Sequence, residues 1–134
     1  MINLTTEAGV WQHFVATPND GYLCCLDYAP VWVFKITEVQ TGEVIIFRPI
    51  LEDNSKRWTE FRILLGNDTP EFGQFIQEKN STWNYEIWST ESGSLDPAEW
   101  DFKAEVGFMQ FHNIVQNEPA AFGSQGYIIP TYNG

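Results

Sequence analysis

Two adjacent cysteines and two histidines are the residues of this chain whose side chains most readily do chemistry. Cys24 and Cys25 stand together in the segment GYLCCLDY. Neighbouring strand residues point to opposite faces, so these thiols cannot easily bridge, and their adjacency lacks the spacing of a zinc or thioredoxin-like motif. An enzyme that used either thiol as its nucleophile would show fast alkylation near neutral pH. We interpret both cysteines as small strand residues, and His13 and His112 as structural residues within expected strands.

Acidic side chains are the next candidates for chemistry. Asp96, Glu99 and Asp101 lie close enough in sequence for a glycosidase pair, but 18 acidic residues make some close pairs expected by chance. The oxygen-rich segments 52–55 and 67–71 do not follow the EF-hand spacing for calcium. The chain also lacks a nucleophile elbow, an HExxH motif and a phosphate-binding glycine loop. We therefore predict a protein that is not an enzyme and has no catalytic, cofactor-binding or metal-binding residues.

Composition and net charge limit the classes of partner that the chain is expected to bind. The 134 residues suffice for one domain with a real core, and 43% of them are hydrophobic. The net charge of −11 repels phosphate groups, so we expect no nucleic-acid partner. No apolar run approaches the roughly 18 residues that span a bilayer, so we expect no membrane partner. The opening MINLTTEAGVWQHF has no basic or apolar leader region, so we expect the protein to stay where it is synthesised.

Short apolar runs separated by turn-forming residues predict an all-β chain. Turn formers concentrate at 17–21, 40–42, 51–57, 66–71 and 78–82. The only helical turn we expect is in LDPAEWDF, where Asp96 caps a turn that has Pro97 at its first position. The predicted strands are Trp11–Ala16, Tyr22–Asp27, Val31–Glu38, Val44–Pro49, Thr59–Leu65, Gly73–Glu78, Trp83–Ser89, Lys103–His112 and Tyr127–Thr131.

Alternation within these strands predicts one apolar face on each. Two sheets packed face to face require this pattern, and a closed barrel would produce it too. The clearest apolar faces are formed by Trp32, Phe34 and Ile36, by Phe61, Ile63 and Leu65, by Trp83, Tyr85 and Ile87, and by Ala104, Val106 and Phe108. We predict a single-domain antiparallel β-sandwich over residues 1–134, Ig-like or jelly-roll-like, with about nine strands and with 116–134 as an extended C-terminal arm.

Aromatic residues provide the candidate binding groups, since 16% of the chain is Phe, Trp or Tyr. Trp58, Trp88 and Trp100 have two interpretations. Exposed rings beside acidic groups are typical of carbohydrate-binding modules, whereas Trp and Tyr are also enriched at protein interfaces, which is the interpretation we favour. In the arm, Tyr127, Ile129 and Tyr132 suit a segment that adds to a neighbouring sheet or groove, or a last strand packed on its own domain.

The middle of the chain, from Tyr28 to about Phe111, carries a series of short motifs. They are Val33-Phe34, Arg57-Trp58-Thr59-Glu60-Phe61, Tyr85-Glu86-Ile87-Trp88, Leu95-Asp96-Pro97 and Glu105-Val106-Gly107. In this order and approximate spacing the motifs resemble those of small structural proteins of tailed bacteriophages that infect Bacteroidetes, including crAss-like phages. Ala29-Pro30 departs from the asparagine and proline usual before the first strand of that pattern, and residues 116–134 lie outside it.

The resemblance implies a virion component, synthesised in the host cytoplasm. Its expected partners are other virion proteins of the capsid, portal-collar or tail, together with copies of itself. The alternative hypothesis is a carbohydrate-binding β-sandwich module used for attachment to the host surface.

Two of the motif residues have physical roles of their own. Arg57 at a strand start would reach Glu60 or Asp96 and tie a loop to the end of a sheet. Gly107 inside a strand predicts a bulge or a close backbone approach, which we place beneath Trp100. Both roles define a fold and neither requires chemistry.

Overall fold

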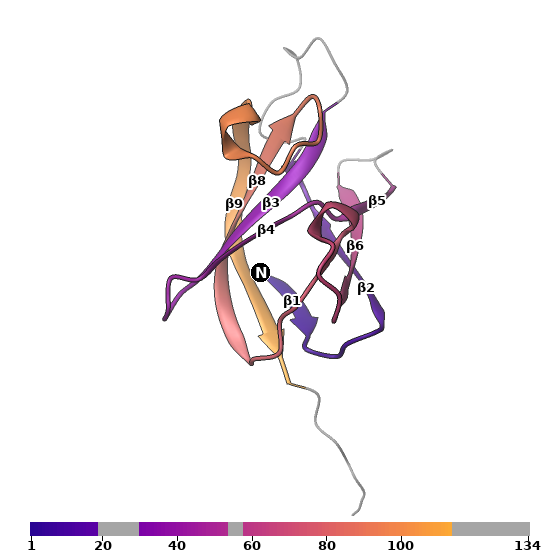
Figure 1. Cartoon of the computed structure of the whole chain (residues 1–134), viewed down its shortest axis with the longest axis vertical. Coiled ribbons are helices and arrows are strands. Elements are labelled where there is room, and N and C mark those ends of the chain that lie inside the picture. Colours follow the sequence, from indigo (N-terminus) through magenta and orange to yellow (C-terminus); the bar gives the residue numbers. More distant parts are fainter. Residues whose placement is uncertain (19–29, 54–57, 114–134) are drawn as a thin grey trace, which may run out of the picture.

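The computed structural model describes residues 1–18, 30–53 and 58–113, and these form two facing β-sheets (Figure 1). Sheet A is ordered β1-β9-β8-β3-β4, and sheet B is ordered β2-β6-β5 with β7 also beside β6. The elements are β1 (Ile2–Thr5), β2 (Trp11–Ala16), β3 (Val31–Glu38), β4 (Val44–Phe47), β5 (Ile50–Asp53), β6 (Thr59–Leu65), η2 (Pro70–Phe72), β7 (Gln74–Phe75), β8 (Ser81–Thr90), η3 (Pro97–Glu99) and β9 (Phe102–His112). The prediction of an all-β sandwich with about nine strands is confirmed.

The strand order favours one of the two predicted architectures. The order β9-β8-β3-β4 opposite β2-β6-β5 corresponds to strands G-F-C-C′ opposite B-E-D in variable-type immunoglobulin sandwiches. Pairing is antiparallel throughout both sheets except between β1 and β9 and between β6 and β7. The described strands therefore follow the Ig-like alternative rather than the jelly roll.

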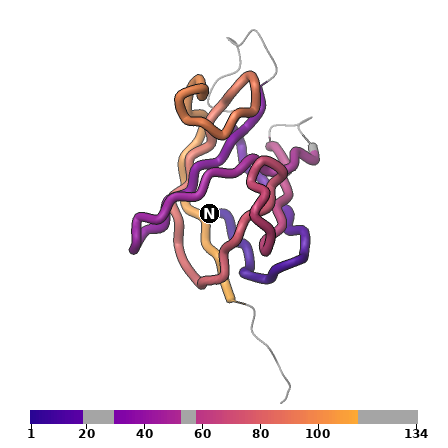
Figure 2. The backbone as a smooth tube through the Cα atoms, in the orientation of Figure 1, coloured from indigo at the N-terminus to yellow at the C-terminus, as the bar shows by residue number. Residues whose placement is uncertain are grey.

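Two of the places where the chain crosses between the sheets bear on the sites described below, and both can be followed in Figure 2. After β1, it passes from sheet A to sheet B, and Gly9 takes a positive φ of 79° while its N–H donates to the Leu65 carbonyl at 2.9 Å. After β4, it passes to β5 through Arg48 and Pro49. The second crossing shapes the pocket described below.

Aromatic rings from both sheets meet in the core around Phe34. Its ring centroid lies 5.3 Å from those of Phe47 and Phe61 and 5.6 Å from that of Phe14. Burying each such ring contributes about 2 kcal/mol through the hydrophobic effect. The inward face predicted for β3 is therefore correct, because Trp32, Phe34 and Ile36 are all buried.

The predicted inward face of β9 is correct for Ala104, which packs against the core, but wrong for Val106 and Phe108. Val106 and Phe108 are 61% and 52% exposed, whereas Met109 and Phe111 are fully buried. The register with β8 shifts between the pairs Ile87–Glu105 and Trp88–Lys103, which leaves one extra residue on β9. Such a bulge reverses which alternate side chains face the core, so Val106 and Phe108 point to solvent.

Two strands were not predicted. β5 occupies part of the segment 51–57 that we had assigned to a turn, and its pairing with β6 is interrupted between Leu51 and Asp53. A short, irregular strand with acidic residues carries little alternation. β1 was missed because it has four residues and pairs with β9, more than 100 residues away. The predicted strands 22–27 and 127–131 lie outside the described residues, as do Cys24, Cys25 and Arg57.

The predicted helical turn is confirmed. Pro97 begins the short 3₁₀ turn η3, and the Asp96 carboxylate accepts a hydrogen bond from the Ala98 N–H at 3.0 Å. A second 3₁₀ turn, η2, was not expected. Its first two residues lie in the 66–71 segment that we predicted as a turn. The turn-forming residues were therefore recognised, but the 3₁₀ geometry was not predicted.

Candidate functional site

The outer surface of sheet A between β9 and β4, here called the sheet A face, exposes three large apolar side chains. These are Val106 at 61%, Phe108 at 52% and Val44 at 49% exposed. Residues directly opposite one another in an antiparallel sheet share a face. One row across the sheet is Val106, Glu86, Lys35 and Ile46, and the next is Phe108, Asn84, Thr37 and Val44. The face thus has apolar margins on β9 and β4 and a polar centre on β8 and β3.

A hollow marks the β9 margin of the sheet A face. It has a volume of about 300 Å³ and is lined by residues of β8 and β9, including Val106 and Phe108. Between those two residues stands Gly107, where an added Cβ would lie 2.7 Å from the Tyr85 ring. The predicted close approach at Gly107 is therefore correct, but its partner is Tyr85 rather than Trp100.

Tyr85 and Glu105 join the two sheets beneath this margin. The Tyr85 hydroxyl donates to the Glu105 carboxylate, which also accepts from the Thr17 N–H at 2.8 Å and from the Thr17 hydroxyl at 3.2 Å. Burial, followed by the hydrogen bond and charge of Glu105, raises the pKa of Tyr85 well above its ordinary value. Sequence reasoning missed this link, and the glycine opposite a tyrosine was its only signal.

Two of the predicted binding residues, Trp88 and Trp100, lie together at the η3 end of sheet A. Their ring centroids are 5.5 Å apart, and the Lys103 ammonium lies 5.6 Å from the Trp88 ring. Both indole N–H groups have internal acceptors. Trp88 donates to Glu86 at 2.9 Å, and Trp100 donates to the Ser94 carbonyl at 2.9 Å. The contact between the two rings holds the 91–101 loop against the sheet, and both indole N–H groups are engaged within the chain.

The other predicted binding residues are not part of this pair. Trp58 is 47% exposed and directly precedes β6 in sheet B. Tyr127, Ile129 and Tyr132 lie outside the described residues.

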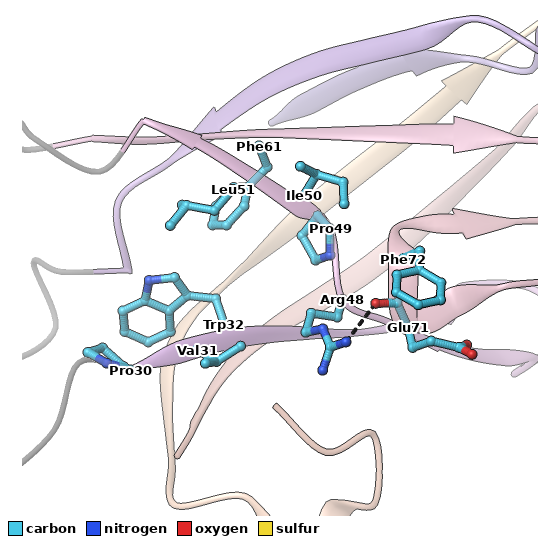
Figure 3. Close-up of a pocket in the computed structure, with 10 residues that line it drawn as sticks. All are labelled: Pro30, Val31, Trp32, Arg48, Pro49, Ile50, Leu51, Phe61, Glu71 and Phe72. Atoms are coloured by element: carbon cyan, nitrogen blue, oxygen red, sulfur yellow. Dashed lines mark hydrogen bonds between the residues drawn. The ribbon is translucent and has the colours of Figure 1, made fainter. Parts of the chain in front are cut away.

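A pocket of about 290 Å³ opens at the corner where the chain crosses from β4 to β5 (Figure 3). Trp32 from sheet A and Phe61 from sheet B are buried at its base, while Leu51 and Phe72 are 49% and 56% exposed. Figure 3 shows Leu51 and Pro49 across the pocket from Trp32. The complete lining is Pro30, Val31, Trp32, Arg48, Pro49, Ile50, Leu51, Phe61, Glu71 and Phe72.

Arg48 closes one end of this pocket and acts as a brace. Its guanidinium donates to the Glu71 carbonyl at 2.9 Å and to the Gly93 carbonyl, and its backbone N–H donates to the Pro70 carbonyl at 2.9 Å. These bonds tie the crossing to η2 and to the loop after β8. With the guanidinium engaged by backbone carbonyls, the pocket suits an uncharged apolar side chain.

On the outer face of sheet B, several charged side chains pair with one another beside the exposed Val15. His13 lies 3.3 Å from Glu60, and Arg62 lies 2.7 Å from Glu52 with its guanidinium 4.5 Å from the centre of the Trp11 ring. Over residues 1–18, 30–53 and 58–113, no three His, Cys, Asp or Glu side chains gather closely enough to hold a metal ion. Within the same ranges no helix has the length and apolar character needed to cross a membrane.

Comparison of the chain with protein-family models, curated proteins and solved structures finds no match. Sequence reasoning named Trp88 and Trp100 but missed Val44, Leu51, Phe72 and the outward turn of Val106 and Phe108. Leu51 stands in a segment that the sequence suggested was a turn, and Phe72 lies between the predicted turn 66–71 and the predicted strand Gly73–Glu78. The bulge in β9 concealed the outward direction of Val106 and Phe108.

Proposed function

We propose that this chain is a non-enzymatic structural protein of a phage virion, which assembles through protein–protein contacts in the capsid, portal-collar or tail. The observation that carries the proposal is the exposure of Val44, Val106 and Phe108 on one face of sheet A. Val106 and Phe108 form an exposed apolar patch at one margin of this face and Val44 adds a second apolar margin, and such exposed patches support an interaction site. The resemblance to phage structural proteins supplies the setting.

The charge of the sheet A face supports a protein partner. The whole chain has a net charge of −11, yet the paired rows of this face carry only Lys35 and Glu86 as charged residues. Lys103 adds a further positive charge, 3.7 Å from Glu86. The charges of this face nearly cancel, so it lacks the excess negative charge of the whole chain and would not repel another copy of the chain. Its partners are neighbouring virion proteins or further copies of the chain.

The direct test is to count the protein in purified virions of its source phage. Quantitative mass spectrometry of density-purified particles should find the chain at a fixed ratio to the major capsid protein. Phe108→Glu should lower that ratio by about tenfold or more, because a buried unpaired charge opposes docking.

Val15→Glu is the matched control for this test, because Val15 is also 52% exposed but lies on sheet B. Its incorporation should equal that of the unaltered chain, and both variants should keep the unaltered melting temperature. Absence of the unaltered chain from virions would overturn the proposal.

The pairing of Trp88 with Trp100 favours the second candidate, a carbohydrate-binding module for host attachment. Aromatic rings beside Glu86 and Lys103 offer a stacking surface with polar groups at its edge. This candidate predicts saturable binding on a glycan array that Trp100→Ala abolishes and Trp58→Ala leaves intact. An array without saturable binding would remove it.

A further inference from the structure

We infer that the pocket at the β4–β5 crossing receives residues Tyr127–Ile129 from the C-terminal arm of a second copy of this chain. The arm would lie beside β5 and insert an apolar side chain between the two sheets. This inference rests on the proposed function, because it names one of the contacts by which the chain assembles.

The first support is the combination of an apolar pocket with an open strand edge. β5 pairs with β6 on one side, and no strand among the described residues pairs with Leu51 and Glu52 on the other. An extended peptide that adds to such an edge gains main-chain hydrogen bonds, while a neighbouring pocket selects its alternate side chains. The pocket beside β5 has the buried Trp32 and Phe61 at its base and Leu51 at its rim.

The second support is the chemistry of the arm. Residues 123–134, GSQGYIIPTYNG, contain no charged side chain, although the chain has 18 acidic residues. An uncharged segment rich in β-formers suits a pocket whose arginine is already bonded to backbone carbonyls. Pro130 lacks an N–H and limits strand pairing to the short stretch before it. That limit matches an edge only four residues long.

The third support is the position from which the arm departs. Trp32 of the pocket pairs with Ser89, which pairs with Phe102, so the pocket lies level with the first residue of β9. The arm leaves after His112, the last residue of β9 and about 34 Å further along the strand. Figure 1 shows these two ends of β9 at opposite ends of the sandwich.

The length of the connecting segment then favours a neighbour over the arm's own pocket. Residues 114–126 span at most about 45 Å when fully extended. A return to the same copy would need this segment to be almost straight along the sandwich and across its width. A second copy placed end to end is reached without that constraint. Such a head-to-tail contact repeats, and so builds rings or open filaments.

The test places a photo-crosslinking amino acid at Ile129 of the full chain. Equal amounts of unlabelled and ¹⁵N-labelled chains are mixed, irradiated and analysed by mass spectrometry. We expect links from position 129 to Leu51 and the residues around it. The share of mixed-isotope links should equal that for random pairing of copies. Links confined to single-isotope chains would overturn the inference by placing the arm in its own pocket.

Two matched variants test the pocket itself. Leu51→Glu, at a residue 49% exposed on the pocket rim, should lower the yield of these links by about tenfold, because it places a charge at an apolar pocket. Val15→Glu, at a residue 52% exposed on sheet B, should leave the yield unchanged. Equal yields from both variants would also overturn the inference.

The two proposals fail separately. If the chain is present in virions but position 129 forms no links near Leu51, the inference fails and the structural role stands. If the links form but the chain is absent from virions, the structural role in the particle fails while the self-association stands.

Discussion

The two outer faces of the sandwich expose different kinds of side chain to solvent. On sheet B the exposed groups satisfy one another, because His13 meets Glu60 and Arg62 meets both Glu52 and Trp11. On sheet A, Val106 and Phe108 are exposed without such neighbours, and the polar residues occupy the centre of the face. Val15 on sheet B is exposed directly opposite Glu60, which pairs with His13, whereas Val106 and Phe108 lie together at one margin of sheet A. One shared core thus supports a face whose charged groups pair with one another and a face with an exposed apolar margin.

The largest loss of stability is expected when the core that both faces share is opened. Phe34→Ala deletes the ring that contacts Phe14, Phe47 and Phe61 and leaves a cavity between the sheets. We expect the free energy of unfolding to fall by about 3 to 5 kcal/mol, measured by chemical denaturation. Phe34→Leu should lose clearly less. Equal stability of Phe34→Ala and the unaltered chain would contradict the described core.

A smaller change should disturb sheet A alone. Gly107→Ala places a methyl group 2.7 Å from the Tyr85 ring, and we expect about 1 to 3 kcal/mol of destabilisation from overpacking. Hydrogen exchange should quicken in β8 and β9 and stay unchanged in β2 and β6. The loss should shrink when Tyr85→Ser is also present, since the ring is then gone. Full additivity of the two substitutions would contradict the contact.

Alkaline pH should act through the same contact. The folded-state pKa of Tyr85 lies above its unfolded value of about 10, so the folded chain holds this proton more tightly. Stability from this group is therefore complete below pH 10 and declines as pH rises above it. Tyr85→Phe should remove this part of the decline and lower stability at neutral pH by about 1 kcal/mol, through loss of the hydrogen bond to Glu105. Denaturation at a series of pH values measures both effects.

The smallest effect is expected on sheet B. Arg62 and Glu52 are about one third exposed, and pairs of this kind contribute about 0.2 to 1 kcal/mol. Glu52→Gln should therefore shift the melting temperature only slightly, and less so at high salt. A loss of stability as large as that of Gly107→Ala would contradict the small contribution expected from the Arg62–Glu52 pair.

The sequence by itself determined the features that depend on neighbouring residues. Alternation placed Trp32, Phe34 and Ile36 on one buried face, because successive strand side chains point to opposite sides. The Asp96-Pro97 pair determined the η3 turn, because a capping carboxylate and a fixed proline φ act within one turn. These local signals predicted a β-sandwich and named Trp88 and Trp100 as candidates, but they predicted neither the contact between the two rings nor the surfaces that the fold exposes.

Only the tertiary structure decided the features that depend on register between distant segments. One extra residue in β9 turns Val106 and Phe108 outward, whereas the only sign of a bulge in the sequence was Gly107, which pairs with Tyr85 outside the shifted stretch. The pocket at the β4–β5 crossing exists because Trp32 and Phe61 come from different sheets. Packing between sheets and pairing across more than 100 residues are set by the whole chain at once. For that reason the class of fold could be predicted from the sequence, whereas the exposed apolar margin of sheet A and the pocket could not.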